Sequence, residues 1–154
     1  MDRTATHASF MKEALKEARK ARDHHDVPIG AVVVLNGQII GRGHNQVEWL
    51  KDPTAHAEMI AITAAAAHEG EKWLREATLY VTVEPCAMCA GASVLARLKR
   101  VVYGVQDIKT GAHSSLFNLL NDPRLNHRID VIPGVEKEAC AALLLDFFES
   151  IREK

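Results

Sequence analysis

The sequence predicts a single α/β domain whose sheet contains both antiparallel and parallel strands, and two observations support this. The first is a helical pattern over residues 7–23 followed by β-branched runs at 29–35 and 38–43, which Asn36-Gly37 joins. Asn-Gly between two such runs is a strong hairpin signal, because both turn positions need a positive φ. The chain is therefore expected to open with a helix and an antiparallel hairpin.

The second observation is a strand–helix–strand unit further along the chain. It comprises a β-rich run over 78–83, a helical run from Cys86 that follows Glu84-Pro85, and a strand over 100–104. Two strands joined by a helix over this length imply a parallel pair with a right-handed crossover.

The remaining elements follow from periodicity and from turn residues. The first helix places apolar residues three and four positions apart, at Phe10, Met11, Ala14, Leu15, Ala18 and Ala21. Gly41 and Gly43 indicate a close backbone approach or a bulge. A polar loop is expected up to residue 54, and an alanine-rich helix over 55–69 with Thr54 or a neighbour as its cap.

The last third of the chain predicts a loop over 105–115, a short helix over 116–120 and a strand over 129–132. A closing helix over 135–152 follows. Its apolar face is expected to comprise Ala139, Leu143, Leu144, Phe147 and Ile151.

Length and composition indicate a globular protein. The 154 residues are 47% hydrophobic and 25% charged, which fits one domain over 1–154. No apolar run approaches the roughly 20 residues of a membrane span, and the first residues lack the shape of a signal peptide. We therefore expect a cytoplasmic protein with no membrane partner.

The charge distribution and the cysteine content indicate which ligands the protein could bind. The net charge is −1, but residues 97–128 hold six basic and two acidic side chains. Such a basic zone fits either a phosphate-contacting face or a solvated loop. The three cysteines, two of them in a CxxC, favour a metal or redox role over a disulfide framework.

Two short motifs carry the chemistry, and each falls at the start of an expected helix. They are His56-Ala57-Glu58 and Pro85-Cys86-Ala87-Met88-Cys89. Thiols three residues apart on a helix project to one side, and a helix N-terminus favours the thiolate that zinc requires. Catalytic zinc sites have three protein ligands and an open position for water. We therefore predict a catalytic Zn²⁺ bound by His56, Cys86 and Cys89, with Glu58 as the acid–base group.

The residues alone leave other interpretations open. A CxxC that opens a helix after a strand also fits a redox centre, and a non-enzymatic zinc-stabilised module is a further possibility. A closed structural zinc site would need a fourth ligand. Cys140 is expected to be a core residue, and His24-His25 to be a solvated turn.

The motif pair resembles the H-x-E and P-C-x-x-C signature of zinc-dependent nucleobase deaminases. Within that group the sequence resembles the bacterial tRNA-specific adenosine deaminases over nearly its whole length. The stretches that carry this resemblance are residues 27–32, 43–45, 52–58, 78–92, 109–112 and 125–128, and Phe147-Phe148 near the end of the last helix.

The resemblance implies a three-layer αβα cytidine-deaminase-like fold with a mixed five-stranded sheet, and a homodimer. It implies one Zn²⁺ per subunit and hydrolytic conversion of adenosine to inosine at the wobble position of a tRNA anticodon stem-loop. A deaminase of free guanine or cytosine, or of a nucleoside, is the alternative within this group.

The resemblance also assigns roles to residues. Zinc falls to His56, Cys86 and Cys89, and proton transfer to Glu58. Substrate contacts fall to Asn45, Asn126, His127, Phe148, Arg152, Asp107 and Lys109. One departure is that this family commonly has Ala-Gly-Ser where this chain has His113-Ser114-Ser115. The missing glycine is expected to stiffen this loop and to alter its RNA contacts.

Overall fold

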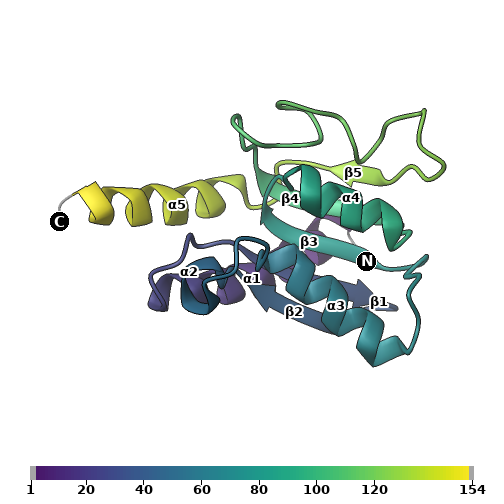
Figure 1. Cartoon of the computed structure of the whole chain (residues 1–154), viewed down its shortest axis with the longest axis horizontal. Coiled ribbons are helices and arrows are strands. Elements are labelled where there is room, and N and C mark those ends of the chain that lie inside the picture. The colour runs from purple at the N-terminus through teal and green to yellow at the C-terminus, as the bar shows by residue number, and fades with distance from the viewer. Residues whose placement is uncertain (1–2, 153–154) are drawn as a thin grey trace.

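A five-stranded mixed sheet forms the centre of the molecule (Figure 1). The structure is a computed structural model that describes residues 3–152. In chain order the strands are β1 (Gly30–Leu35), β2 (Gln38–His44), β3 (Thr78–Val83), β4 (Arg100–Val105) and β5 (Asp130–Ile132). The strand order across the sheet is β2-β1-β3-β4-β5, with β1 antiparallel to β2 and β3, and with β3, β4 and β5 parallel. The predicted combination of a hairpin and a parallel crossover is confirmed.

Helices cover both faces of this sheet, which gives three layers (Figure 1). The helices are α1 (Arg3–Asp23), α2 (Val47–Leu50), α3 (Ala57–Glu69), α4 (Ala87–Leu95) and α5 (Lys137–Arg152). Strand residues alternate between two buried clusters, as the two-residue repeat of a strand requires. Val33, Leu79 and Val101 pack with α3 and α4, whereas Val32, Tyr80 and Val102 pack with α1 and Cys140 of α5.

Glycines let α3 lie directly against β2. A Cβ atom on Gly41 would lie 2.3 Å from the carbonyl oxygen of Ala61, and one on Gly43 would lie 2.3 Å from that of Ala57. The predicted close approach is therefore confirmed, and the register also shifts between Val33 and Val34. This packing fixes the start of α3 relative to the sheet.

Four local predictions were wrong. Residues 116–120 form an irregular loop and no helix, because their backbone N–H groups donate to the carbonyls of Gly111 and Ala112. The expected polar loop contains α2, and α3 begins at Ala57 without a side-chain cap from Thr54, whose hydroxyl donates to Asp52.

The fourth concerns the inward face of α5. Ala139 and Ile151 are exposed, whereas Cys140 and Phe147 are buried. Gly104 explains this rotation, because its missing Cβ leaves the space that the Cys140 thiol occupies. Cys140 is therefore a core residue, as predicted, and the far half of α5 extends beyond the sheet (Figure 1).

Within residues 3–152, none of the helices combines the length and the apolarity that crossing a membrane requires.

Candidate zinc site and substrate cleft

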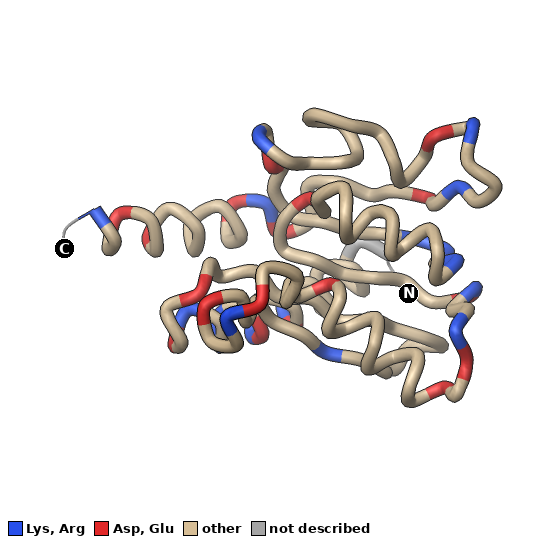
Figure 2. Tube along the Cα trace, viewed as in Figure 1, with Lys and Arg blue, Asp and Glu red and all other residues tan. Residues whose placement is uncertain are grey.

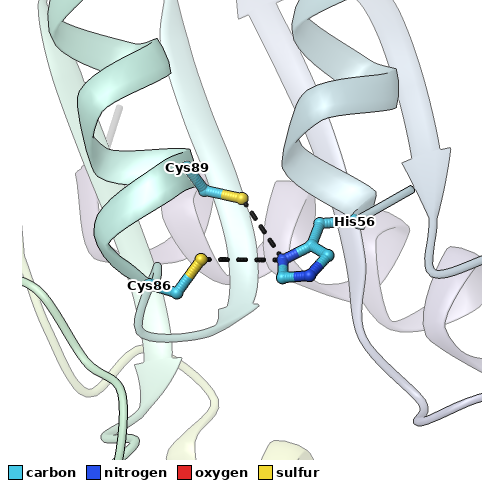
Figure 3. A group of neighbouring side chains, drawn as sticks. All are labelled: His56, Cys86 and Cys89. Carbon is cyan, nitrogen blue, oxygen red and sulfur yellow. Dashed lines mark hydrogen bonds between the residues drawn. The ribbon is translucent and has the colours of Figure 1, made fainter. Parts of the chain in front are cut away.

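The starts of α3 and α4 bring the two halves of the predicted motif together (Figure 3). His56 is the N-cap residue of α3, and Cys86 is the N-cap residue of α4, with extended backbone at both positions. Cys89 lies in the first turn of α4. Both helices thus begin at the same point, with the positive ends of their dipoles directed at it.

The three side chains have the spacing of a zinc ligand set. The Nδ1 atom of His56 lies 3.6 Å from the Sγ atom of Cys86 and 3.5 Å from that of Cys89 (Figure 3). The three ligand atoms lie within 4.8 Å of one another. A tetrahedral zinc with Zn–S of about 2.3 Å and Zn–N of about 2.0–2.1 Å separates its N and S ligands by about 3.5–3.6 Å. The residues therefore fit zinc.

Hydrogen bonding divides the protons between the two thiols. The hydrogen bond from Cys89, helped by His56, lowers the pKa of Cys86 to about 4 despite its burial. The same bond to Cys86, together with burial, raises the pKa of Cys89. Zinc binds thiolates, so metal uptake would release the remaining thiol proton.

Glu58 lies in the first turn of α3, close to these three side chains, and is only 4% exposed. Desolvation is the main cause that raises its pKa to about 7, and the neighbouring Cys86 adds to this. A carboxyl with a pKa near neutral can both accept and donate a proton. This buried acid is therefore suited to proton transfer, and it is not a member of the group of three possible metal ligands.

Asn45 connects the end of β2 to the start of α3. Its Oδ1 atom accepts the N–H of Ala57 at 2.9 Å, which satisfies one of the free N–H groups of the first turn. This distant side chain caps the helix that neither Thr54 nor His56 caps. Asn45 also lines the cleft beside His56, so its amide nitrogen is the group left for a ligand.

The site opens into a cleft of about 930 Å³. Of the residues predicted to contact substrate, Asn45, Asp107 and Phe148 line it together with His56. Arg152 is exposed one residue after Ile151, which also lines the cleft. Lys109 is exposed in a turn, where the Asp107 carboxylate accepts its N–H.

The other two predicted contacts lie elsewhere. The side chain of Asn126 bonds to Arg97 just beyond the C-terminal end of α4, and His127 Nε2 donates to the carbonyl of Leu98 at 2.8 Å. The zinc ligands lie at the N-terminal end of α4, which is about 13.5 Å away along nine helical residues. Within one chain the structure therefore does not bring Asn126 and His127 to the cleft.

The basic zone is correspondingly divided. Arg97, Lys99 and Arg100 lie where β4 begins, and Arg128 lies where β5 begins, whereas Lys109 follows the C-terminal end of β4. Figure 2 shows blue segments gathered at the end of the sheet where β4 and β5 begin. Most of this charge is therefore remote from the zinc site.

One functional residue of this site, Glu84, was not predicted from the sequence. Glu84 is 2% exposed, and its carboxylate accepts four backbone N–H groups, those of Asp107, His113, Ser114 and Ser115, together with the Ser115 hydroxyl. Glu84 ends a fully buried strand, directly before Pro85. A charged residue at such a place was the available signal for a carboxylate that holds a loop.

Glu84 thereby fixes the loop that follows β4 onto the start of α4. Ala112 N–H also donates to the carbonyl of Pro85, and a Cβ atom on Gly111 would lie 2.3 Å from the Glu84 carboxyl carbon. His113 Nδ1 and the Tyr103 hydroxyl share a further hydrogen bond at 2.9 Å. Ser114 has no positive φ, so its position in the loop does not require glycine.

The known proteins that this sequence resembles are deaminases. A family model for the cytidine and deoxycytidylate deaminase zinc-binding region matches residues 4–105. A tRNA-specific adenosine deaminase of Bacillus subtilis (strain 168) is 50% identical over 145 residues, which cover 94% of this chain and 90% of that protein. The tRNA-specific adenosine deaminase of Aquifex aeolicus (strain VF5) is 46% identical over 93% of this chain and 94% of its own length.

Solved structures agree on the architecture. One from a study of A-to-I editing by tRNA:A34 deaminases at the wobble position of transfer RNA has a TM-score of 0.85 and 45% identity, and the match covers 88% of this chain and 99% of that chain. A guanine deaminase from Nitrosomonas europaea has a TM-score of 0.79 over 91% of this chain and 83% of its own, at 24% identity. The second likeness concerns the fold alone. The predicted three-layer fold with a mixed five-stranded sheet is confirmed.

Proposed function

Because this chain belongs to the cytidine and deoxycytidylate deaminase family, we propose that it is a zinc-dependent enzyme that converts adenosine to inosine in transfer RNA. The convergence of His56, Cys86 and Cys89 beside a buried Glu58 supports the chemistry. The observation that carries the substrate is the near-complete coverage, in both directions, of tRNA-specific adenosine deaminases. The wobble adenosine is the proposed target, since the 45%-identical structure concerns deaminases of that position.

The site residues divide the work between metal binding and proton transfer. His56, Cys86 and Cys89 would hold the zinc, which when bound supplies Lewis-acid activation of the water that attacks C6 of the base. Glu58 accepts a proton from that water and delivers it to N1 of the adenine ring. It then moves the proton of the new C6 hydroxyl to the departing amine, so that the C6–N bond breaks, the C6 carbonyl forms and ammonia leaves. Its raised pKa suits both directions of transfer.

An anticodon loop suits the open cleft. Its bases are already single-stranded, so turning one of them into the cleft costs little. Asn45 would donate its amide N–H to the bound nucleoside, while Asp107 and Phe148 would contact it or its neighbours. Lys109 and Arg152 would reach the phosphates from the rim.

A homodimer would account for the two remote residues. Several apolar side chains at the end of α4 and in the loop after β4 are exposed: Leu95, Ile108, Leu116, Phe117 and Leu125. A second copy would cover them, and would let Asn126 and His127 of one chain contact RNA held by the other. We further propose that residues 1–154 form one deaminase domain that acts in the cytoplasm.

The decisive experiment is an inosine assay on a tRNA with a wobble adenosine, run beside free adenosine, guanine and cytosine. Inosine in the tRNA alone is the expected result. Glu58→Ala should retain one zinc per chain and lose at least about a hundredfold in turnover. Steady turnover of free guanine or cytosine without inosine in the tRNA would instead establish a free-base deaminase. Full activity of Glu58→Ala would refute the role of the carboxyl.

A further inference from the structure

Trp49 stands at the wall of the cleft that holds His56 and Asn45. It belongs to α2, and its side chain is 60% exposed. Single exposed apolar residues are ordinary on protein surfaces. Trp49 is not isolated, however, because Phe148, 43% exposed, and Ile151, 51% exposed, line the same cleft.

The backbone under this tryptophan is held in place from beneath. Asp26 is 2% exposed, and its two carboxylate oxygens accept the N–H groups of Glu48 at 3.1 Å and Trp49 at 3.2 Å. Gln46 N–H donates to the carbonyl of Ala55, which closes the segment against the start of α3. The position of the indole is therefore tied to the zinc ligand His56, which directly follows Ala55.

The ring itself is supported on one side. The imidazole of His24 packs against the indole with a centroid distance of 4.1 Å, and His24 in turn stacks on His44 at 6.2 Å. This contact restricts the rotation of an otherwise exposed side chain. An aromatic ring that is fixed before binding loses little conformational entropy when a flat ligand stacks on it.

The size of the cleft indicates more than one occupant. Pockets for drug-sized ligands are about 300–1,000 Å³, and this cleft of about 930 Å³ is at the upper end of that range. A single nucleobase over His56 leaves much of it unfilled. Trp49 and His56 line this same cleft, so a base bound over His56 and a neighbouring base of the strand would share it.

We propose that Trp49 is a stacking platform for the nucleobase adjacent to the reacting adenosine, so that it positions the RNA strand without reading its sequence. The assignment rests on the proposed RNA substrate and adds a positioning residue to it. Single-stranded RNA is commonly held by stacking on aromatic side chains, and this tolerates any base because every base has a π-face. Trp49 does not contact the reacting atoms and contributes to RNA binding alone.

A double-mutant cycle tests the contact directly. Trp49→Ala is expected to raise KM for an anticodon hairpin by about 5- to 160-fold, while Trp49→Phe should keep most of the affinity. The loss should fall on KM and not on kcat at saturating hairpin, because Trp49 does not contact the reacting atoms. Hairpins with an abasic nucleotide on the 5′ or the 3′ side of the adenosine supply the second half of the cycle. One of them should cost the wild type as much as Trp49→Ala does, and cost the variant nothing more.

A binding signal separates this proposal from the proposed reaction. The chain has two tryptophans, so Trp73→Phe leaves Trp49 as the only one. In that background, with Glu58→Ala to prevent turnover, the hairpin should quench the fluorescence of Trp49. Additive losses at both abasic positions, an unchanged KM for Trp49→Ala, or bound RNA without quenching would each overturn the platform while leaving inosine formation intact. Quenching by RNA in an enzyme that makes no inosine would overturn the reaction and retain the platform.

Discussion

Glu84→Gln tests how far one buried carboxylate organises the site. The wild-type oxygens accept the N–H groups of His113, Ser114 and Ser115 on one side and that of Asp107 on the other. Glutamine keeps the shape of the side chain and one acceptor oxygen. The NH2 group of the glutamine must then face the backbone N–H of Asp107. Both groups are hydrogen-bond donors, so the N–H of Asp107 loses its acceptor.

The expected loss follows from these contacts. A hydrogen bond to a charged group contributes about 1.5–3 kcal/mol, and a buried N–H left without an acceptor costs about 1–3 kcal/mol. The bonds share one carboxylate and are not additive. We therefore expect Glu84→Gln to lower the free energy of unfolding by about 3 kcal/mol. For a chain of this length that corresponds to about 6–12 °C in Tm.

The pH dependence has a defined sign. Burial raises the pKa of Glu84, but the hydrogen bonds from Ser115, Ser114 and His113 outweigh it and hold the pKa below its usual value of 4.5. Such a carboxylate stabilises the fold above its unfolded pKa of about 4.3, and this stabilisation is lost as pH falls through the native pKa. The difference between wild type and Glu84→Gln should therefore be full at pH 7 and shrink below pH of about 4.

Urea unfolding at saturating zinc, at several pH values, measures this difference. Glu76→Gln is the matched control, because Glu76 is exposed and its carboxylate pairs with the Lys99 ammonium at 3.4 Å on the surface, so its loss should stay within about 0.5 kcal/mol. A loss below about 1 kcal/mol for Glu84→Gln at pH 7 would refute the reasoning, since one exposed hydrogen bond contributes as much. A difference that persists unchanged below pH 4 would show that the charge is not its source.

Three further outcomes are expected. Asn45→Ala should lower the free energy of unfolding by about 1 kcal/mol, because the N–H of Ala57 loses its cap, and it should also raise KM for the tRNA. Asn45→Asp keeps an acceptor oxygen and should retain the stability. Equal thermal unfolding of the two variants would contradict this role of the cap. Gly41→Ala should cost about 1–3 kcal/mol through its clash with the Ala61 carbonyl, whereas Gly91→Ala, with open space around it, should be neutral or stabilising in the same denaturation assay. Treatment with a zinc chelator should abolish inosine formation and re-addition of zinc should restore it, so activity retained after measured loss of the metal would exclude zinc chemistry.

Local signals predicted the elements that depend on neighbours in sequence. Asn36 and Gly37 have φ of 51° and 76°, as the Asn-Gly turn requires. The grouping of His56, Cys86 and Cys89 was predictable because each of its two motifs opens a helix and consists of a few adjacent residues. Gly41 and Gly43 predicted close packing because a glycine has no side chain to hold a neighbouring helix away from the strand.

Features that depend on distant partners were not predictable in this way. The α2 helix is too short to have a periodic pattern, and it is held by Asp26, more than twenty residues earlier in the chain. The inward face of α5 depends on Gly104 rather than on its own sequence. The separation of Asn126 from the cleft is a property of strand order, because β5 pairs with the beginning of β4.

The placement of the proposed zinc ligands also affects the stability of the fold. His56 follows the antiparallel hairpin, whereas Cys86 begins the parallel crossover, 30 residues later. A metal ion bound by both closes a loop across the two halves of the sheet, as a disulfide would. For an ion that stays bound to both residues in the unfolded chain, the chain-entropy estimate for a 30-residue loop disfavours the unfolded state by about 3.6 kcal/mol. Total stabilities of domains are about 5–15 kcal/mol, so the zinc ion that activates water would also contribute a large share of the free energy of unfolding.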